Sequence, residues 1–362
     1  MDNGIFDLME SHDYENIIFC QEKTLGLRAI IVIHDTTLGP AAGGIRMWPY
    51  ESEADAIQDA VRLARGMTYK CAAIGLPYGG GKCVILGDPK RDKTEGMLRG
   101  LARFINRLGG LYLTGEDVGT TLSDMEIMRN ESPYVVTVPE AMGGPGDSAP
   151  ATAFGVFQGM RACLRVVYGS PLTQGRTVAI QGVGAVGTEL VRHLVEAGAT
   201  VTIADVDQEK VSAVAAQYNV KVVQPDEIAG LDVDVFSPCA MGAILNDQTL
   251  AQLRCKIVCG SANNQLAEDR HGDLLAQKEI LYAPDYIVNA GGVVSSLDSF
   301  SSGGFNRQRA MDKVSRIYKT MSTIIAIATE QHIPTYRAAD VVAEQHVAMM
   351  RQVKMLSNGN NL

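Results

Sequence analysis

The chain has 362 residues, of which 46% are hydrophobic and 20% are charged. This length usually requires more than one hydrophobic core, so we expect two domains, and the composition excludes an intrinsically disordered chain. The formal net charge is -9, and lysine and arginine form no run that could follow a phosphate backbone, which argues against nucleic-acid binding.

The first predicted elements are two strands followed by a helix. Residues 16–20 and 27–33 are apolar runs rich in β-branched side chains, and the second run leads to a Gly39-Pro40 turn. A serine then precedes residues 53–65, an acidic and alanine-rich stretch whose apolar residues recur at helical spacing. We therefore expect a capped helix that leads towards Lys70.

A second helix and a short strand are predicted next. Residues 94–108 have helical spacing and end at two glycines, and residues 111–113 form a short apolar run before Gly115-Glu116-Asp117. Residues 143–150 are rich in glycine and proline, after which a helical pattern resumes at residues 151–168. This loop is where we place the boundary between the domains, and we expect it to act as a hinge.

The second half of the chain alternates strand and helix patterns, which predicts a parallel sheet. The alternation begins with strands at 177–181, 200–204 and 221–223 and helices at 187–197 and 208–218. Further strand patterns lie at 233–237, 256–259 and 279–282, and long helical patterns at 306–331 and 338–350. The sequence therefore predicts an α/β protein.

The cysteines and the N-terminus indicate the compartment. Seven cysteines are scattered without a CxxC motif, which favours reduced thiols over a disulfide framework or a zinc site. The first ten residues are acidic, and no apolar run approaches the roughly 18 residues that a membrane span needs. We expect an untargeted cytoplasmic protein without a membrane partner.

A dinucleotide-binding fingerprint follows the strand at 177–181. The GxGxxG motif consists of Gly182, Val183, Gly184, Ala185, Val186 and Gly187. In such a motif the first glycine permits a tight turn, the second lets the backbone approach a pyrophosphate, and the third lets the helix pack on the strand. The alternative, a purely structural glycine turn, is disfavoured because the motif follows a strand and opens a helix.

Asp205 predicts which dinucleotide is bound. It ends the next predicted strand, and 205 − 187 places it 18 residues after the fingerprint, near the ~20 expected for an acid that binds a ribose hydroxyl. A carboxylate here, with Asp207 close by, would repel a 2′-phosphate, and no arginine lies within residues 204–208. The sequence therefore favours NAD over NADP.

Two lysines and one aspartate are catalytic candidates. Lys82 follows three glycines, but the spacing and Cys83 exclude a phosphate-binding P-loop, so we expect the glycines to line a cleft floor. Lys70 lies in an apolar neighbourhood and should have an anionic partner. An exposed or structurally paired role is the usual one for a lysine, and Asp117, like Glu116, could equally be a turn or cap residue. The histidines show no metal-binding spacing, so we expect no metal.

Seven motifs, taken together, resemble the leucine, phenylalanine and valine dehydrogenases over nearly the whole chain. They are His34-Asp-Thr-Thr-Leu-Gly-Pro40, Gly66-Met-Thr-Tyr-Lys70, Gly79-Gly-Gly-Lys82, Gly115-Glu-Asp117, Pro238-Cys-Ala240, Gly260-Ser-Ala-Asn-Asn264 and Asn289-Ala-Gly-Gly292. The resemblance implies a substrate and oligomerisation domain at 1–147, a Rossmann-type NAD domain at 148–330, and a helical segment at 331–362 that packs back towards the first domain. It also implies a homo-oligomer and an active site in a cleft between the domains.

The resemblance also assigns roles to individual residues. Lys82 would activate water, Asp117 would exchange protons with the substrate nitrogen, and Lys70 would bind the substrate carboxylate. Further substrate contacts would come from Gly43, Gly44, Asn263 and Asn264, and the side-chain pocket from Ala42, Gly115, Val293 and Val294. Besides the fingerprint and Asp205, the cofactor would contact Val206, Thr152, Cys239, Ala240, Ala262, Asn263 and Asn289.

The preferred amino acid is less clearly indicated. Leucine-type members usually carry leucine at the Ala42 position and alanine at the Gly115 position. This chain therefore has a smaller residue at two positions of the side-chain pocket. Gly115 and residues 143–148 are similar to phenylalanine-type members, whereas Val293 and residues 116–121 are similar to leucine-type ones, and residues 295–304 depart from both. We favour leucine and other branched-chain amino acids, with phenylalanine or tryptophan as the alternative.

Two other classes of function share parts of this pattern. A 2-hydroxy-acid dehydrogenase has the same nucleotide fold but needs a histidine base and a carboxylate-binding arginine. A non-catalytic NAD-binding sensor would not need Lys70, Lys82 and Asp117 together. We therefore expect an NAD-dependent enzyme that converts an apolar L-amino acid to its 2-oxo acid and ammonia.

Overall fold

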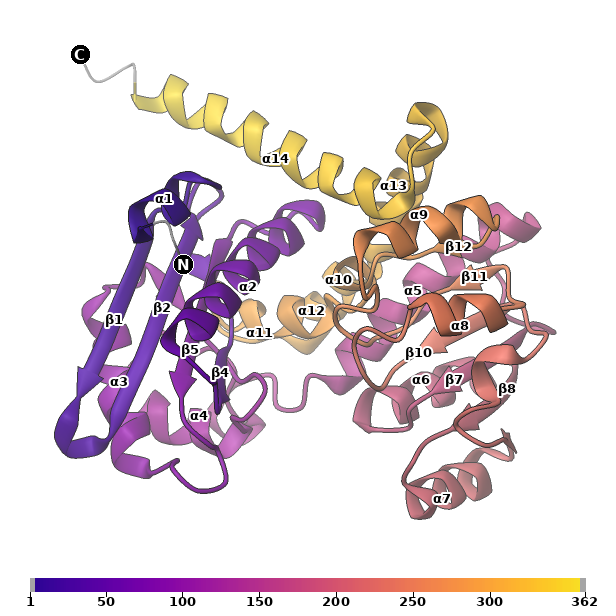
Figure 1. Cartoon of the computed structure of the whole chain (residues 1–362), viewed down its shortest axis with the longest axis horizontal. Coiled ribbons are helices and arrows are strands. Elements are labelled where there is room, and N and C mark those ends of the chain that lie inside the picture. The colour runs from indigo at the N-terminus through magenta and orange to yellow at the C-terminus, as the bar shows by residue number, and fades with distance from the viewer. Residues whose placement is uncertain (1–3, 359–362) are drawn as a thin grey trace. The chain divides into compact units, whose positions relative to one another are not determined.

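The structure is a computed structural model that describes residues 4–358, with side chains through residue 354. The chain forms two compact units (Figure 1). The first unit contains residues up to 147 together with 296–307 and 342–358, and the second contains residues 148–295 and 308–341. These units differ from the predicted division, in which residues 296–307 lay in the NAD domain and that domain ended at residue 330.

The physical reason for this difference is visible in the contacts of the segments concerned. Leu297 accepts a hydrogen bond from the Tyr78 hydroxyl at 3.4 Å, and Arg307 pairs with Glu140, so residues 296–307 pack within the first unit. In the second unit, the Tyr286 hydroxyl donates to Asp340 Oδ1 at 2.9 Å.

The first unit is a mixed sheet with helices on both faces. In chain order its elements are α1 (Ile5–Glu10), β1 (Asn16–Glu22), η1 (Lys23–Leu25), β2 (Leu27–Asp35), β3 (Ala41–Ala42), β4 (Ile45–Trp48), α2 (Glu53–Ala73), β5 (Gly79–Leu86), α3 (Glu95–Arg107), β6 (Tyr112–Leu113), α4 (Leu122–Arg129) and η2 (Glu140–Met142). The strand order is β1-β2-β5-β3-β6, with β4 also pairing with β5. β1 and β2 pair antiparallel, whereas β3 and β4 run parallel to β5.

The alternation of side chains along these strands creates two cores. Ile31, Ile33, Cys83 and Ile85 point to one face and pack with apolar residues of α3 and α4. Ile30, Val32 and Val84 point to the other face and pack with alanines and other apolar residues of α2. The central strand β5 is therefore covered on both sides.

Two predicted features of the first unit changed. The helix predicted at 53–65 extends as α2 to Ala73, so Lys70 lies in its last turn rather than after it. The Ser52 side chain caps this helix by accepting a hydrogen bond from the Asp55 N–H at 3.1 Å, as the sequence indicated. The glycines before Lys82 do not line a cleft floor, because they form the start of the buried strand β5.

Close packing is the physical reason for this glycine run. A Cβ atom on Gly80 would lie 2.2 Å from both the backbone nitrogen and the hydroxyl of Thr68 in α2, a separation that real Cβ atoms essentially never show. A Cβ on Gly79 would meet the Asp35 carbonyl oxygen at 1.9 Å, and one on Gly81 would meet the Tyr112 ring. The glycines therefore allow α2 and the neighbouring strands to approach β5 closely.

The second unit is a parallel six-stranded sheet with helices around it. Its elements are α5 (Ala149–Tyr168), β7 (Thr177–Gln181), α6 (Ala185–Glu196), β8 (Thr200–Ala204), α7 (Gln208–Tyr218), β9 (Lys221–Val222), η3 (Ile228–Gly230), β10 (Val235–Pro238), α8 (Asp247–Gln252), β11 (Ile257–Val258), α9 (Asp269–Gln277), β12 (Leu281–Tyr282), α10 (Asp285–Val288) and α13 (Ile317–Gln331). Three helices contain residues of both units, namely α11 (Gly291–Asp298), α12 (Arg307–Ser315) and α14 (Thr335–Asn358).

The strand order of this sheet is that of a dinucleotide-binding fold. The order β12-β11-β10-β7-β8-β9 places the first strand of the unit, β7, between β8 and β10, where the direction of strand succession reverses. All its strand pairs are parallel, and Leu250 of α8 and Leu275 of α9 pack against Phe236 and Val258 of the sheet. The prediction of an α/β protein with a Rossmann-type second domain is confirmed.

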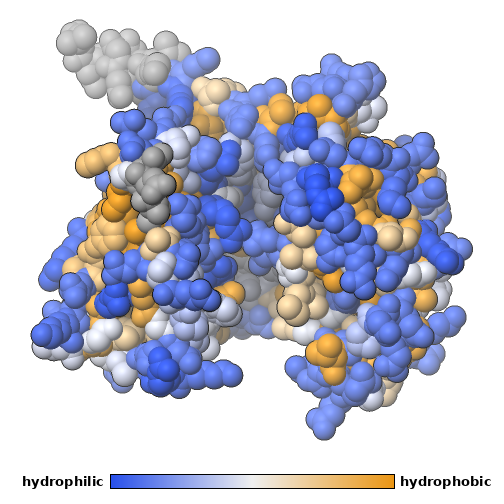
Figure 2. All heavy atoms as spheres, viewed as in Figure 1, coloured by the Kyte–Doolittle hydropathy of each residue, from blue (hydrophilic) through white to orange (hydrophobic). Residues whose placement is uncertain are grey.

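Hydrophilic side chains cover much of the face of each unit that Figure 2 shows, with hydrophobic side chains between them. Over β1, at the left of this view, hydrophobic residues gather, and Phe19 of β1 is 54% exposed.

All seven cysteines are free thiols, and six are buried. Among the helices that the structure describes, none is long and apolar enough to cross a membrane.

Substitution of Gly80 tests the close packing of β5 on α2. We expect Gly80→Ala to lower the free energy of unfolding by at least ~2 kcal/mol, because the new methyl group meets backbone that cannot move aside cheaply. Gly66→Ala in α2 is the control, since no atom lies within 4 Å of its Cβ position and alanine favours a helix interior by up to ~1 kcal/mol. Urea unfolding measures both, and equal stability of the two variants would contradict the packing argument.

Candidate active site

The register of the first sheet places several predicted site residues on one face. Side chains of paired residues in neighbouring strands point to the same face of a sheet. Ala42 pairs with Gly80 of β5 and with Leu113 of β6. Because alternate residues share a face, Ala42, Lys82 and Gly115 all lie on the face that α2 covers.

A turn held against β4 positions Asp117 near this face. The Asp117 N–H donates to the Thr120 hydroxyl at 3.0 Å, and that hydroxyl donates to the Ile45 carbonyl at 2.8 Å. The Met47 N–H donates to the Val118 carbonyl at 2.9 Å. Asp117 is thus a turn residue, one of the two roles that the sequence left open, but its carboxylate has other partners.

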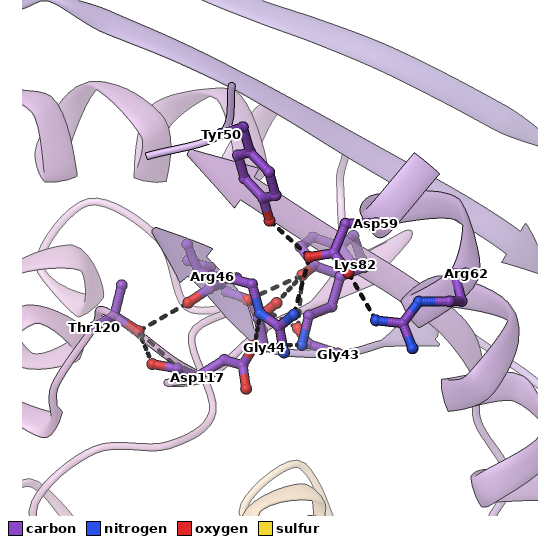
Figure 3. A network of polar contacts seen from close by, with 12 residues as sticks. Gly43, Gly44, Arg46, Tyr50, Asp59, Arg62, Lys82, Asp117 and Thr120 are labelled. Atoms are coloured by element: carbon purple, nitrogen blue, oxygen red, sulfur yellow. Dashed lines mark hydrogen bonds and ion pairs between the residues drawn. The ribbon is translucent and has the colours of Figure 1, made fainter. Parts of the chain in front are cut away.

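Two cations share one oxygen of this carboxylate (Figure 3). Lys82 Nζ lies 2.8 Å from Asp117 Oδ2, and Arg46 Nε lies 3.1 Å from the same atom. Lys82 is only 5% exposed, whereas the Asp117 side chain is 22% exposed. The ion pair therefore buries the lysine and leaves Oδ1 as the carboxylate oxygen that neither cation contacts.

The charges around Asp117 control its ionisation. Burial disfavours its charged form, but the Lys82 ammonium and the Arg46 guanidinium outweigh burial and hold the pKa of this carboxyl below its ordinary value. Burial, reinforced by Asp147 and Asp124, instead raises the pKa of the adjacent Glu116. The two neighbouring carboxyls are therefore shifted in opposite directions, and only Asp117 has cationic partners.

Further charged residues, which the sequence did not indicate, hold Arg46 on the side away from Asp117. Arg46 Nη1 lies 2.9 Å from Asp59 Oδ2, which also accepts a hydrogen bond from the Tyr50 hydroxyl at 2.7 Å. Arg62 Nη2 lies 2.9 Å from the other Asp59 oxygen (Figure 3). The available signal was a charged residue, Arg46, between two apolar residues of a short strand, since a buried charge of this kind needs a partner.

The glycines assigned to substrate contact have a packing role. A Cβ on Gly43 would lie 1.8 Å from the Gly81 carbonyl oxygen, and one on Gly44 would lie 2.6 Å from the Glu116 carbonyl oxygen. The Gly43 carbonyl accepts a hydrogen bond from the Tyr112 hydroxyl at 2.6 Å. Close strand packing therefore already explains why both positions are glycine.

The dinucleotide fingerprint occupies the turn between β7 and α6. Gly182 has φ +98°, and a Cβ there would lie 2.7 Å from the Ala240 methyl carbon, while a Cβ on Gly187 would lie 2.1 Å from the Gly182 carbonyl oxygen. Gly184 differs, because no atom lies within 4 Å of its Cβ position and no side chain caps the helix that it starts. The described turn is therefore tight at the first and third glycines and open at the second, as a pyrophosphate cradle requires.

Asp205 follows β8 and is tied to the fingerprint. Its Oδ2 accepts a hydrogen bond from the Val183 N–H at 2.8 Å, and its Oδ1 accepts one from the Asp207 N–H at 3.0 Å. Val206 beside it is 85% exposed. The carboxylate thus links two neighbouring βα turns, a positioning role that its spacing in the sequence did not reveal.

The other residues assigned to the cofactor follow the carboxyl ends of the parallel strands. Cys239 and Ala240 follow β10, Ala262 and Asn263 follow β11 together with Asn264, which was assigned to the substrate, and Asn289 follows β12 and ends α10. The Asn289 amide donates to Asn263 Oδ1 at 2.7 Å. This edge is where nucleotides bind in open parallel sheets.

Of the remaining predicted residues, Lys70 lies in the last turn of α2, and Thr152, Val293 and Val294 lie on helices of the second unit. The Thr152 hydroxyl donates to the Ser148 carbonyl at 2.9 Å in the first turn of α5. A Cβ on Gly292 would lie 2.8 Å from that hydroxyl, so the start of α11 packs on α5. Val294 of α11 is buried and Val293 is partly buried. Among the described residues, no group of three or more potential metal-binding side chains occurs.

Two family models match the chain along most of its length. The model of the Glu/Leu/Phe/Val dehydrogenase dimerisation domain matches residues 15–134, and that of the Glutamate/Leucine/Phenylalanine/Valine dehydrogenases matches residues 143–209 and 203–355. The chain belongs to the Glu/Leu/Phe/Val dehydrogenase family. The resemblance derived from the seven motifs is thereby confirmed, as is the prediction of an oxidoreductase.

Individual members of this dehydrogenase family are similar over their whole length. Leucine dehydrogenase from Geobacillus stearothermophilus is 50% identical over 99% of this chain and 98% of the relative. Phenylalanine dehydrogenase from Caldalkalibacillus thermarum is 43% identical over 100% of this chain and 98% of the relative. The crystal structure of L-tryptophan dehydrogenase from Nostoc punctiforme has a TM-score of 0.85 at 40% identity, covering 96% of this chain and 100% of that one.

Acid unfolding tests the ion pair at the centre of this candidate site. Because the pKa of Asp117 is depressed in the folded state, its contribution to stability is present above its unfolded pKa of ~3.9 and is lost as the pH falls through the folded pKa. We expect Asp117→Asn to cost about 3 kcal/mol at pH 7, since it leaves Lys82 without its anion, and to flatten the decline of stability below pH 4. Urea unfolding from pH 7 to pH 2 measures both effects.

The exposed carboxylate Asp226 provides the control for this measurement. Asp226→Asn should leave both the stability at pH 7 and its decline in acid close to those of the unsubstituted protein. An Asp117→Asn protein with the same acid dependence as the Asp226→Asn protein would show that the pair contributes nothing to folding.

Proposed function

We propose that this chain is an NAD-dependent dehydrogenase that oxidatively deaminates leucine and other branched-chain L-amino acids to 2-oxo acids and ammonia. The observation that carries the proposal is the buried Lys82–Asp117 ion pair, which sets a potential base and a proton-exchanging carboxylate 2.8 Å apart. A leucine dehydrogenase from Geobacillus stearothermophilus is 50% identical over nearly the whole chain, which supports leucine as the substrate.

In the proposed reaction the chain first orients the amino acid. Lys70 binds its carboxylate, and Asp117 accepts a hydrogen bond from its amino group through Oδ1, the oxygen that Lys82 and Arg46 leave uncontacted. The depressed pKa keeps Asp117 ionised, so that the carboxylate can take up a proton from the substrate nitrogen and later return it. Arg46, which is itself held by Asp59, fixes the orientation of the Asp117 carboxylate.

Loss of the Cα hydride converts the amino acid to an imino acid, and hydrolysis of this imino acid requires a base and a proton donor. Lys82 in its neutral form takes a proton from water as the oxygen attacks the imino carbon. Asp117 returns a proton to the nitrogen, the carbon–nitrogen bond breaks as the new hydroxyl group gives its proton to water, and ammonia and the 2-oxo acid leave. The 2.8 Å contact gives a direct path for a proton between the two side chains.

The fingerprint turn supports a dinucleotide cofactor. The open position at Gly184 and the uncapped start of α6 suit a pyrophosphate, and Thr152, Asn263 and Asn289 are the proposed partners of its other groups. NAD, when bound, supplies the acceptor for the hydride that leaves the substrate Cα. Asp205 favours NAD because a 2′-phosphate would be repelled by its carboxylate.

The substrate side chain is proposed to contact small and apolar residues. Ala42, Gly115, Val293 and Val294 carry no charge, so an acidic side chain would lose its hydration without gaining a counterion. An aromatic amino acid is the second candidate, supported by the 40% identity to the tryptophan dehydrogenase and by the small side chain of Ala42. An apolar pocket discriminates between such substrates by only ~1–3 kcal/mol per methylene.

We also propose that the chain assembles into a homo-oligomer through its first unit. The matched family model for residues 15–134 is described as a dimerisation domain, and β1 exposes Phe19 to solvent in the single chain. The seven free cysteines support a reducing, cytoplasmic location.

An activity panel tests the proposed reaction. Purified protein is mixed with NAD at alkaline pH, and NADH absorbance is followed with leucine, valine, isoleucine, phenylalanine, tryptophan, glutamate or lactate. We expect leucine to give the highest kcat/KM and Lys82→Ala to lower it by at least ~100-fold, because general base catalysis contributes roughly that much. The exposed Lys90 serves as control, and Lys90→Ala should retain full activity.

Each other outcome of this panel has a defined meaning. A higher kcat/KM for phenylalanine or tryptophan than for leucine would show that an aromatic amino acid is the preferred substrate. Oxidation of lactate would indicate a hydroxy-acid dehydrogenase. Silence with every substrate, while NAD still binds in a calorimetric titration, would favour a non-catalytic sensor.

Asp205→Ala tests the choice of cofactor. Removing the carboxylate removes repulsion of a 2′-phosphate and also frees the Val183 N–H that Asp205 holds. We expect kcat/KM for NAD to fall by about ten-fold or more while that for NADP falls less, so that their ratio decreases. An unchanged ratio would show that Asp205 only positions the fingerprint turn.

A further inference from the structure

Thr137 occupies the space that a side chain at residue 115 would need. A Cβ on Gly115 would lie 2.2 Å from the Thr137 hydroxyl oxygen and 3.0 Å from the Thr137 Cβ. Thr137 is 4% exposed, so its side chain fills this space from within the first unit rather than from solvent. The volume that glycine releases at residue 115 is therefore already taken.

The strand pairing places the Thr137 hydroxyl on the sheet face that carries Lys82. Gly115 lies two residues after Leu113 in an extended segment, and its carbonyl accepts a hydrogen bond from the Ile45 N–H at 2.9 Å. Its missing side chain would point to the same face as Lys82 and Ala42. The Thr137 hydroxyl lies where that side chain would be, and so on the face that carries the ion pair.

We propose that Thr137, in place of residue 115, limits the size of the amino-acid side chain that the enzyme accepts. This inference rests on the proposed function, in which residue 115 contributes to the substrate side-chain pocket. Thr137 fills the space beside Gly115. Of the two pocket positions with a smaller residue than in leucine-type members, only Ala42 therefore leaves additional room for the substrate side chain. Filling of this space favours a branched aliphatic side chain over an aromatic ring.

The test compares the ratio of kcat/KM for phenylalanine to that for leucine in the unsubstituted enzyme and in Thr137 variants. Thr137→Gly should raise the ratio about ten-fold, since it vacates volume that an aromatic ring can use. Thr137→Val is the matched control, because valine keeps the shape and removes only the hydroxyl, and it should change the ratio less than about three-fold.

A double substitution tests the geometry independently of activity. Gly115→Ala alone should destabilise the protein, because its methyl group would overlap Thr137. Gly115→Ala combined with Thr137→Gly should recover the stability, so that the two effects are strongly non-additive in urea unfolding. The double variant should also return the substrate ratio to within a few-fold of the unsubstituted enzyme, because the alanine methyl refills the vacated space.

The possible results separate the two levels of the argument. An active enzyme whose phenylalanine-to-leucine ratio is unchanged by Thr137→Gly would overturn the role of Thr137 alone. Additive stability effects of the two substitutions would overturn the packing on which it rests. An enzyme that oxidises no amino acid would overturn the proposed function and this inference with it.

Discussion

The burial of one ammonium group determines the arrangement of the first unit's site. Lys82 lies on the central strand of a sheet that is covered on both faces, where an uncompensated charge would cost several kcal/mol. Asp117 supplies the counterion, but a second cation, Arg46, also contacts it, and Arg46 in turn requires Asp59. Each buried charge thus needs a counterion, and the series of ion pairs ends at Arg62, whose side chain is about half exposed at the surface.

Glycine serves two opposite purposes in this chain. At Gly80 and Gly182 the backbone of one element comes so close to another that a methyl group has no room, and the glycine is a consequence of packing. At Gly184 the space beside the backbone is open, and the glycine leaves room for a molecule that is not part of the chain. The sequence shows the same letter at all three positions, and only the surroundings distinguish them.

More of the fold than of the candidate site could be predicted from the sequence. Strand and helix alternation predicted the parallel sheet, and the GxGxxG spacing predicted the turn between β7 and α6, because both depend on neighbours along the chain. The prediction that the glycines before Lys82 line a cleft floor was wrong, because the helix α2 packs against them. The contact of Gly80 with Thr68 of α2 joins two elements, and the local sequence does not show it. Arg46, Asp59 and Thr137 were missed because their roles arise from contacts between strands and helices that are distant in sequence.

The network around Asp117 also carries an excess of positive charge. Three cations, Lys82, Arg46 and Arg62, are paired with only two carboxylates, Asp117 and Asp59, while the whole chain has a formal net charge of -9. Because Glu116 next to Asp117 and the nearby Asp147 and Asp124 are acidic, this excess acts only on a small anion that comes close to the network. Dissolved salt weakens such attraction over distances of about 10 Å, so the capture of a carboxylate substrate becomes a property of the medium as well as of the protein.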